Sequence, residues 1–272
     1  MRLESEAHAA GRGLWQDPQP VEPWTWRRME HGDSPAPLNA GPIAQEYYEG
    51  TEGLSGDALR EALHEIISDQ EVLSYKDCWT ALMYTDEDPA NPNHVILLYT
   101  GWSIPKEEHG TGKDQWNREH VWAKSRGDFG TTMGPGTDIH HLRPADVTVN
   151  SSRNNRAFDN GGQPDLDDGR ETGCNMDSNS WEPRDADKGD VARMMFYMDV
   201  RYEDSPDLKL VQGEENGKKP LHGKLSALLE WHRQDPVDDF ERRRNERIFE
   251  LQRNRNPFID YPGFVDLIWG NN

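Results

Sequence analysis

The chain has 272 residues, 33% of them hydrophobic and ten of them tryptophan, and its formal net charge at pH 7 is −20. This apolar fraction is low for a globular protein but well above a disordered composition, and no run of about 18 apolar residues could form a transmembrane helix. The charge excludes a general attraction to polyanions, so any nucleic-acid site would have to be locally basic.

Charge is unevenly distributed along the chain. Excess acid lies in loop-like segments such as residues 165–168 and 235–239, whereas arginine is concentrated in residues 116–158 and 242–255. A solvated acidic surface is the simplest explanation of the net charge. The two arginine-rich segments are then the candidates for contact with phosphate groups.

The two ends of the chain differ in composition. Residues 1–42 are rich in Pro, Gly and charge and predict a flexible extension, followed by one domain over residues 43–272. The N-terminus lacks the apolar stretch of a secretory signal, so the signal is absent from this chain or export follows another route. The two cysteines, Cys78 and Cys174, leave one disulfide or two buried thiols open.

The first predicted elements are a helix and two strands. Leucine and isoleucine recur at helical spacing between Leu59 and Ile67, which predicts a helix over residues 54–73 with Ser55 as its N-cap. Residues 79–84 and 94–100 are short apolar runs bounded by turn residues, and we expect them to be core strands.

The most informative segment lies at residues 116–158. It contains R-E-H-V-W, then D-I-H-H-L-R-P, then V-N-S-S-R-N-N-R, with Gly and Pro between them. Glu119 and His120 would point to opposite faces of a regular strand, but a bend would bring both to one site. Two short strands and a helix that starts near Asn150 would bring Glu119, His120 and Asn150 together. A carboxylate, an imidazole and an amide in one site are typical of a metal-assisted hydrolase.

Three further helices are predicted towards the C-terminus, over residues 190–202, 221–232 and 242–252. The methionines of the first helix, Met194, Met195 and Met198, have the spacing of core residues rather than of a metal site. The third helix is highly charged, and Pro257 is expected to stop it.

These motifs resemble the endonuclease I family of bacterial nucleases, which belongs to the His-Me finger (ββα-metal) nucleases. The resemblance rests on R-E-H-V-W-A-K-S at 118–125, D-I-H-H-L-R-P at 138–144, V-N-S-S-R-N-N-R-A-F at 149–158 and W-E-P-R-D-A-D-K-G-D-V-A-R-M-M-F-Y-M at 181–198. It extends to Y-Y-E-G-T-E-G-L-S-G near residue 50 and to N-R-N-P-F-I-D at 254–260, so it covers about residues 45–270. It implies an α+β fold in which a ββα-metal finger is embedded in a helix-rich single domain.

The resemblance also implies roles for individual residues. His120 matches the general base, and Glu119 and Asn150 match the metal ligands, with Asn150 at the start of the finger helix. Glu119 and His120 would end the first strand of the finger, and residues 138–142 would form the second strand. His141 would support the site by orienting His120 or by binding phosphate.

Other polar residues have more open roles. Arg153 and Asn155 would bind phosphate or lock the finger helix. One arginine would stabilise the transition state, with Arg126, Arg143, Arg153 and Arg184 as candidates. The expected substrate-binding residues are Arg118, Arg126, Arg143, Asn155 and Arg184. The chain departs from the family at Ala123, where Pro is common, and at Arg253, where Gly is common.

The function expected from this resemblance is a metal-dependent, largely sequence-non-specific endonuclease that cleaves DNA, with RNA as an alternative substrate, and leaves 5′-phosphate ends. Mg²⁺ is the expected cofactor, for which Mn²⁺ or Ca²⁺ could substitute. We expect a monomeric protein with no membrane partner, secreted or periplasmic.

Two other classes of function were weighed. A catalytically inactive relative that binds nucleic acid or protein would lack the metal or the base. A structural zinc module could use His140, His141, Cys78 and Cys174, but the chain has no C-x-x-C or H-x₃-H pair.

Overall fold

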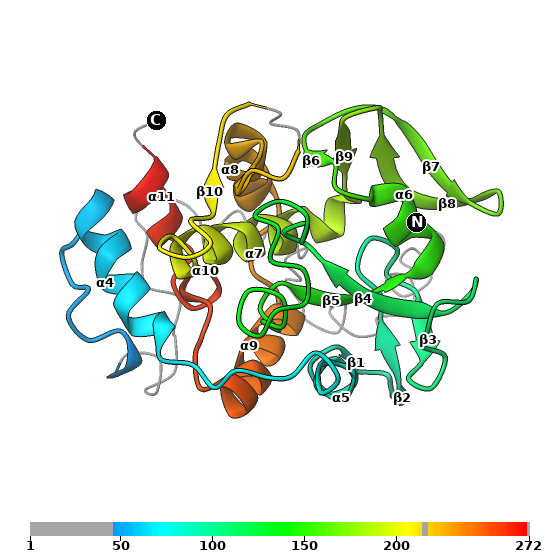
Figure 1. Ribbon diagram of the computed structural model, residues 1–272, viewed down its shortest axis with the longest axis horizontal. Coiled ribbons are helices and arrows are strands. Elements are labelled where there is room, and N and C mark those ends of the chain that lie inside the picture. Colours follow the sequence, from blue (N-terminus) through cyan, green and yellow to red (C-terminus); the bar gives the residue numbers. More distant parts are fainter. Residues whose placement is uncertain (1–45, 214–216, 271–272) are drawn as a thin grey trace, which may run out of the picture. The chain divides into compact units, whose positions relative to one another are not determined.

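The computed structural model describes residues 46–213 and 217–270, so the extension expected at residues 1–42 lies outside the described residues. The described part has a mixed α+β fold with several small sheets, and most of the strands lie towards the right of Figure 1. Its helices are α4 (Gly56–Ser68), α5 (Cys78–Thr85), α6 (Val147–Arg153), α7 (Lys188–Arg201), α8 (Leu225–Gln234), α9 (Asp239–Gln252), α10 (Pro257–Asp260) and α11 (Phe264–Trp269), with a 3-10 turn, η2 (Asp185–Asp187).

The strands are short. They are β1 (Glu87–Asp88), β2 (Asn91–Ile96), β3 (Ser103–Pro105), β4 (Trp116–His120), β5 (Leu142–Asp146), β6 (Ala157–Phe158), β7 (Gln163–Asp167), β8 (Arg170–Met176), β9 (Ser180–Glu182), β10 (Lys209–Leu210) and β11 (Leu221–His222). They form sheets with the orders β1-β2-β3, β4-β5, β6-β9-β8-β7 and β10-β11.

The predicted helix at residues 54–73 is confirmed as α4, but it ends at Ser68. Leu59, Leu63 and Ile67 are buried one turn apart, as the spacing predicts. Ser55 has the extended backbone of an N-cap, yet its side chain makes no capping hydrogen bond.

The prediction of a strand at residues 79–84 is wrong, because these residues lie in α5. Its buried positions, Cys78, Ala81, Leu82 and Thr85, have helical spacing. A short apolar run does not distinguish a buried strand from a buried helix. The strand expected at residues 94–100 is confirmed in its first half only, since β2 ends at Ile96 and the chain then leaves the sheet.

The strands β4 and β5 are antiparallel, and α6 follows β5 directly. Glu119 and His120 end β4, as expected. The second strand begins at Leu142 instead of covering residues 138–142, because residues 138–141 form a buried turn that leads into it.

Helix α6 begins earlier than the sequence suggested. Asp146 caps it by accepting hydrogen bonds from the backbone N–H groups of Thr148 at 2.7 Å and Val149 at 3.1 Å. Asn150 is therefore the fourth residue of the helix rather than its first.

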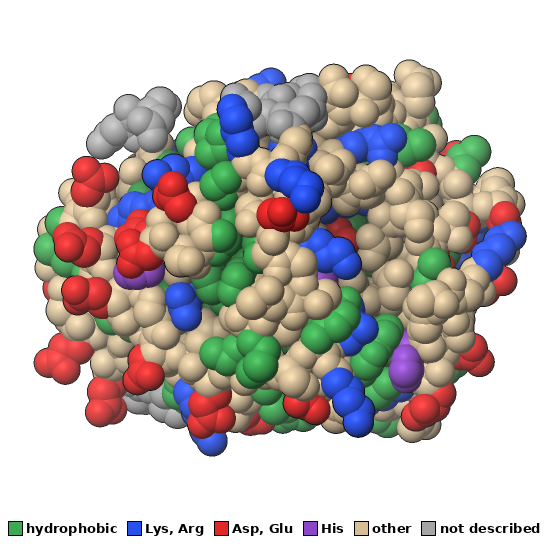
Figure 2. Space-filling model, in the orientation of Figure 1, with side chains coloured by type: hydrophobic (Ala, Val, Ile, Leu, Met, Phe, Trp, Pro, Cys, Tyr) green, Lys and Arg blue, Asp and Glu red, His purple; other side chains and the backbone are tan. Residues whose placement is uncertain are grey.

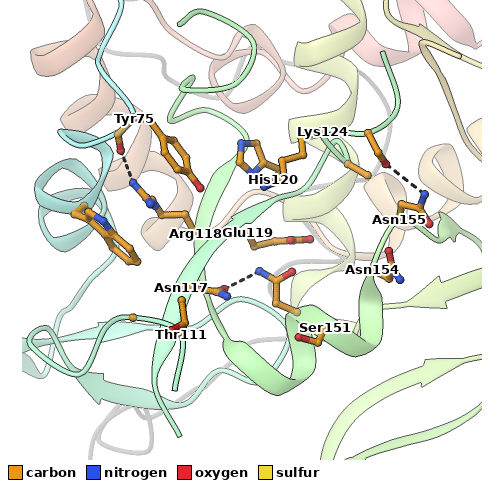
Figure 3. Close-up of a pocket in the computed structure, with 15 residues that line it drawn as sticks. Tyr75, Thr111, Asn117, Arg118, Glu119, His120, Lys124, Ser151, Asn154 and Asn155 are labelled. Carbon is orange, nitrogen blue, oxygen red and sulfur yellow. Dashed lines mark hydrogen bonds between the residues drawn. The ribbon is translucent and has the colours of Figure 1, made fainter. Parts of the chain in front are cut away.

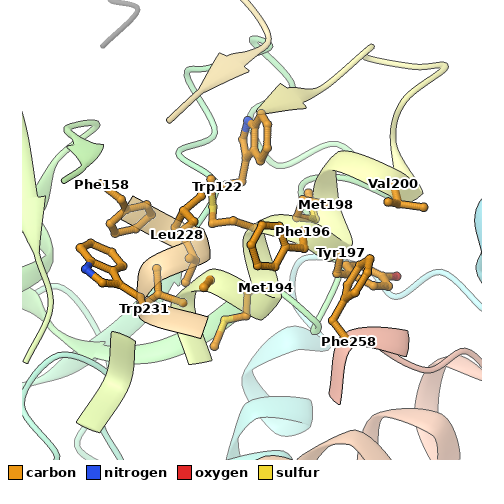
Figure 4. Packing of buried hydrophobic residues seen from close by; sticks show 14 of the residues in the cluster. Trp122, Phe158, Met194, Phe196, Tyr197, Met198, Val200, Leu228, Trp231 and Phe258 are labelled. Carbon is orange, nitrogen blue, oxygen red and sulfur yellow. The ribbon is translucent and has the colours of Figure 1, made fainter. Parts of the chain in front are cut away.

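Helix α7 lies at the centre of the core, and most of its side chains are buried all round. It packs against α4, α8 and α10. Met194, Met195 and Met198 fill the core as predicted. Figure 4 shows Met194 and Met198 among labelled aromatic side chains such as Phe196. Within the described residues, Cys78 and Cys174 are free and buried, and no helix is long and apolar enough to span a membrane.

The other C-terminal helices are confirmed with different boundaries. Residues 221–222 belong to β11, so α8 starts at Leu225. A capping box between Asp238 and Glu241 starts α9 three residues earlier than expected. The helix ends at Gln252 because Arg253 adopts the left-handed conformation (φ 64°) that favours glycine. Pro257 does not stop this helix; it opens α10.

Burial of His232 predicts a pH-dependent stability. Its Nε2 contacts the carbonyl oxygen of Pro262 at 3.1 Å and its Nδ1 faces Arg193 at 3.5 Å, and desolvation followed by Arg193 lowers its pKa to about 4. Because the folded-state pKa lies below the unfolded value, the neutral ring contributes stability that is complete above pH ~6.5 and is lost as the pH falls through ~4.

The matching variant is His232→Gln, which cannot titrate. The difference in unfolding free energy between the wild type and this variant should shrink by about 3 kcal/mol between pH 7 and pH 4, measured by urea denaturation. A difference that stays constant over this range would contradict the assignment.

Candidate active site

A cavity of about 570 Å³ opens beside the end of β4 and along α6 (Figure 3). Its lining combines polar and aromatic side chains from four separate parts of the chain: Tyr75, Trp79, Gly110, Thr111, Asn117, Arg118, Glu119, His120, Ala123, Lys124, Ser125, Asn150, Ser151, Asn154 and Asn155. Glu119, His120 and Asn150 therefore lie around one cavity.

Glu119 lies at the buried end of this cavity, with 3% of its surface exposed. One carboxylate oxygen, Oε1, accepts a hydrogen bond from Tyr99 Oη at 2.9 Å and lies 3.4 Å from Arg153 Nη1. Desolvation raises the pKa of Glu119, and Arg153 opposes that shift. Neither of these two contacts uses the second oxygen, Oε2, and Glu119 lines the cavity, so the carboxylate can serve as a ligand for a cation there.

His120 lines the cavity with one of its two ring nitrogens tied to the protein. Its Nε2 lies 3.0 Å from the carbonyl oxygen of Gly136, and since a carbonyl only accepts, Nε2 carries the proton. The Nδ1 atom of the neutral ring is then the free base. Desolvation and, next, His141 lower the pKa of His120 well below its usual value. The ring therefore stays neutral and can take a proton.

Asn150 is oriented by a neighbour on β4. Its Nδ2 donates to Asn117 Oδ1 at 2.7 Å, a bond drawn as a dashed line in Figure 3. That contact leaves the amide oxygen of Asn150 available as a ligand. Asn117 could have been found from its spacing, because it is two residues before Glu119 and so shares its face of the strand.

Arg153 and His141 support the site from behind and are completely buried. Arg153 donates to the carbonyl oxygens of His120 (3.3 Å), Val121 (2.6 Å) and Asn154 (3.1 Å), which favours its role as a lock between β4 and α6. His141 Nε2 is bound to the Pro135 carbonyl oxygen at 2.8 Å, and its ring packs 5.6 Å from that of His120. Neither residue lines the cavity.

Three of the expected substrate-binding arginines also lie outside the cavity lining. Arg143 is buried and paired with Asp86 and Asp190. Arg184 pairs with Asp187 at 2.6 Å. Arg126 is buried and binds the carbonyl oxygens of Asn155 and Leu221. Each guanidinium is thus engaged by the protein itself.

Two cations do line the cavity. Arg118 is held between Tyr75, 3.5 Å from that ring's centroid, and Trp79, at 4.0 Å, and it has no acidic partner among the described residues. Desolvation lowers the pKa of Arg118. Lys124 is exposed and close enough to lower the pKa of both Glu119 and His120. Both cations are suited to bind an anion.

The aromatic wall was not found by sequence analysis. Tyr75 and Trp79 come from the segment around α5, about forty residues before β4, and part of it had been predicted as a strand. On the face drawn in Figure 2, Asp and Glu side chains gather over α4, while several Lys and Arg side chains lie around the centre. Local positive charge therefore coexists with the acidic surface.

The donors in the cavity suit a hard cation. One carboxylate and one amide oxygen, completed by water, are a usual set for Mg²⁺. Across residues 46–213 and 217–270, no group of three His, Cys, Asp or Glu side chains is placed to hold a metal. The residues of the zinc alternative are therefore not assembled into such a group in this structure.

Comparisons with known proteins show which family the sequence matches. A family model described as Endonuclease I matches residues 55–263. An extracellular ribonuclease of Bacillus subtilis (strain 168) is 61% identical over 236 residues, 85% of this chain and 81% of the relative. An extracellular ribonuclease of Bacillus amyloliquefaciens is 57% identical, over 87% of this chain and 82% of the relative. A periplasmic deoxyribonuclease of Aeromonas hydrophila is 32% identical, over 45% of this chain and 47% of the relative.

The lock formed by Arg153 can be tested through stability. Arg153→Leu leaves Glu119 buried without its cation and frees three carbonyl groups, so we expect a loss of about 3–5 kcal/mol in unfolding free energy. Tyr99→Phe removes only one hydrogen bond to Glu119 and should cost about 2 kcal/mol. Urea denaturation measures both.

The control for this pair is Arg242→Leu. Arg242 is an exposed arginine that pairs with Asp239 at 3.2 Å, and its removal should change stability by at most about 0.5 kcal/mol. An Arg153→Leu protein as stable as this control would disprove the lock.

Proposed function

The chain belongs to the endonuclease I family, and from that premise we propose that this nuclease is a metal-dependent endonuclease that hydrolyses RNA, with His120 as its general base. The observation that carries the proposal is that Glu119, His120 and Asn150 line one cavity, together with Arg118 and Lys124, for which the described part of the chain offers no acidic partner. An inactive binding relative would have no need of a neutral base beside a carboxylate.

The choice of RNA revises the order expected from the sequence, which placed DNA first. The two Bacillus relatives, which match more than four fifths of the chain, are named ribonucleases, whereas the Aeromonas deoxyribonuclease matches less than half. DNA is the second candidate substrate because of that deoxyribonuclease. The names of the same relatives support a protein that acts outside the cell.

The steps assigned to the protein follow from the positions of its side chains. His120 Nδ1 takes a proton from the attacking water while Nε2 stays bound to Gly136, which keeps the ring in one tautomer. Arg118 binds the oxygens of the phosphate that is cleaved and offsets their charge. Side chains with these roles would contact the phosphodiester rather than the base edges, which supports weak sequence preference. The 5′-phosphate products are proposed from the resemblance to the family, with the 3′ oxygen as the leaving group.

The metal site assigned to the protein consists of Glu119 and Asn150. Mg²⁺, for which Mn²⁺ or Ca²⁺ could substitute, would stabilise negative charge on the phosphate and on the leaving 3′ oxygen. The carboxylate of Glu119 is positioned by Tyr99 and Arg153, and the amide of Asn150 by Asn117. Such neighbours of metal ligands normally set the affinity of the site.

The base assignment predicts that His120→Ala lowers kcat on RNA by about 10²–10⁴-fold, because water loses its proton acceptor. Cleavage of RNA and of plasmid DNA would be followed on gels in the presence of Mg²⁺, and circular dichroism would confirm that the variant is folded. The wild type should cleave RNA with the higher kcat/KM.

The control for the base is His94→Ala. His94 lies on β2 and contacts Ser103 at 2.9 Å, away from the cavity, so its removal should leave cleavage unchanged. A His120→Ala enzyme that keeps more than about a tenth of the wild-type rate would refute the assignment.

The metal assignment predicts a difference between two variants of Asn117. Asn117→Ala lets the Asn150 amide rotate and should weaken Mg²⁺ binding by about 10–100-fold, whereas Asn117→Asp keeps an acceptor for Asn150 Nδ2 and should bind more tightly than the alanine variant. Isothermal titration calorimetry with Mg²⁺ alone measures both without reference to activity. Equal affinities in the two variants would count against the assigned ligand orientation, as would RNA cleavage that survives a chelator.

A further inference from the structure

The cavity extends past Glu119 and His120 into a polar end formed by Lys124, Ser125, Asn154 and Asn155, which we call the amide arm. Figure 3 shows Lys124, Asn154 and Asn155 together on one side, with Tyr75, Arg118 and Thr111 on the opposite side. The roles assigned so far to Glu119, His120 and Asn150 do not require this arm. Its chemistry therefore calls for a separate ligand.

Lys124 supplies the charge of the amide arm. Its side chain is exposed, and no hydrogen bond or ion pair to it is found among residues 46–213 and 217–270. Most lysines of this acidic chain are paired, for example Lys188 with Glu182 at 2.7 Å and Lys209 with Asp207 at 2.9 Å. An unpaired ammonium group next to the catalytic cavity is suited to bind an anion.

Asn154 supplies a second indication, because its backbone is strained. Its φ of 54° and ψ of −121° are unfavourable for any residue with a Cβ atom. Two bonds hold this conformation: Asn154 N–H donates to the Asn150 carbonyl oxygen at 2.9 Å, and Arg153 binds the Asn154 carbonyl oxygen at 3.1 Å. The side chain makes no hydrogen bond within the described residues, so the strain is not compensated by its amide.

The backbone carbonyl groups of the amide arm are directed away from the cavity. The Asn154 oxygen is bound by Arg153, and the Asn155 oxygen accepts from Arg126 Nε at 3.0 Å and Nη2 at 2.7 Å. Both arginines are buried, with 0% and 2% of their surface exposed. The groups that would repel an anion at this helix end are therefore neutralised from behind, while an ammonium group and the side-chain amides line the cavity.

We propose that the amide arm is a second phosphate subsite, which binds the phosphodiester group next to the one that is cleaved. This inference rests on the proposed function, because it needs a nucleic-acid strand in the cavity. Lys124 neutralises the neighbouring phosphate, and the Asn154 amide donates hydrogen bonds to its oxygens. The Asn155 Nδ2 donates one hydrogen to Ser125 Oγ at 3.3 Å, and its second hydrogen remains for the phosphate. The enzyme therefore prefers a substrate with at least two consecutive phosphodiester linkages.

The test couples a change in the enzyme to a change in the substrate. The reference substrate is a trinucleotide with two normal phosphodiester linkages. In two modified trinucleotides, either the first or the second linkage is replaced by a neutral methylphosphonate next to a 2′-O-methyl sugar, and the other linkage stays normal. In the wild type, neutralising the linkage on one side should lower kcat/KM for the other linkage by about tenfold. In the Lys124→Ala enzyme, the same methylphosphonate should lower kcat/KM by less than about twofold.

The matched control is Lys209→Ala, which removes the same charge from an exposed lysine away from the cavity and should respond to the methylphosphonate as the wild type does. Equal losses in the wild type and in Lys124→Ala would overturn the subsite. A wild-type enzyme that cleaves none of the trinucleotides or longer RNA would instead contradict the proposed function, and the subsite with it.

A second variant distinguishes the effect of the Asn154 side-chain amide from the effect of the strained Asn154 backbone. Asn154→Gly adopts the same backbone without strain, so it should lower kcat/KM on trinucleotides by about tenfold with no fall in Tm. A purely structural role for Asn154 predicts unchanged kcat/KM, and that result would overturn the part assigned to its side chain.

Discussion

The whole candidate site depends on the burial of one guanidinium group. Arg153 lies between the end of β4 and the end of α6, where it pairs with Glu119 and binds the carbonyl oxygens of His120, Val121 and Asn154. The same group thus fixes the backbone of the proposed base, the carboxylate of the proposed metal site and the strained end of the helix. A buried cation in this position is tolerated because its two Nη atoms meet carbonyl oxygens and the Glu119 carboxylate, and the ring of Phe158 lies 4.7 Å from its Cζ.

A similar use of arginine explains how a chain with a net charge of −20 can present a site for phosphate. Several arginines are almost fully buried: Arg126, Arg143, Arg153, Arg193, Arg244 and Arg255. They join distant segments through carboxylates and carbonyl oxygens, as Arg193 does with Glu241 and Arg244 with Asp86. Much of the positive charge is therefore buried inside the fold, and the surface is acidic. Arg118 and Lys124 are cations that still line the cavity.

Sequence reasoning succeeded where the signal is local and failed where partners are distant. Helices α4 and α7 were predicted because a helix buries residues three and four positions apart. The run at residues 79–84 predicts a strand because six residues are too few to show helical spacing. It folds as the helix α5, which packs against α9. The second strand of the site was placed four residues too early, because the buried turn at residues 138–141 is held by Gln252 and by tyrosines of the α7 segment.

The sequence by itself determined the family and the three chemical groups of the candidate site, since Glu119, His120 and Asn150 occur in motifs that can be read in order along the chain. Only the tertiary structure decided which arginines act as braces and which cations face the cavity. It also decided that Tyr75 and Trp79 form a wall of that cavity and that Asn117 orients Asn150. The physical reason is that burial and ion pairing depend on partners such as Asp86 for Arg143, whose separation along the chain carries no local pattern.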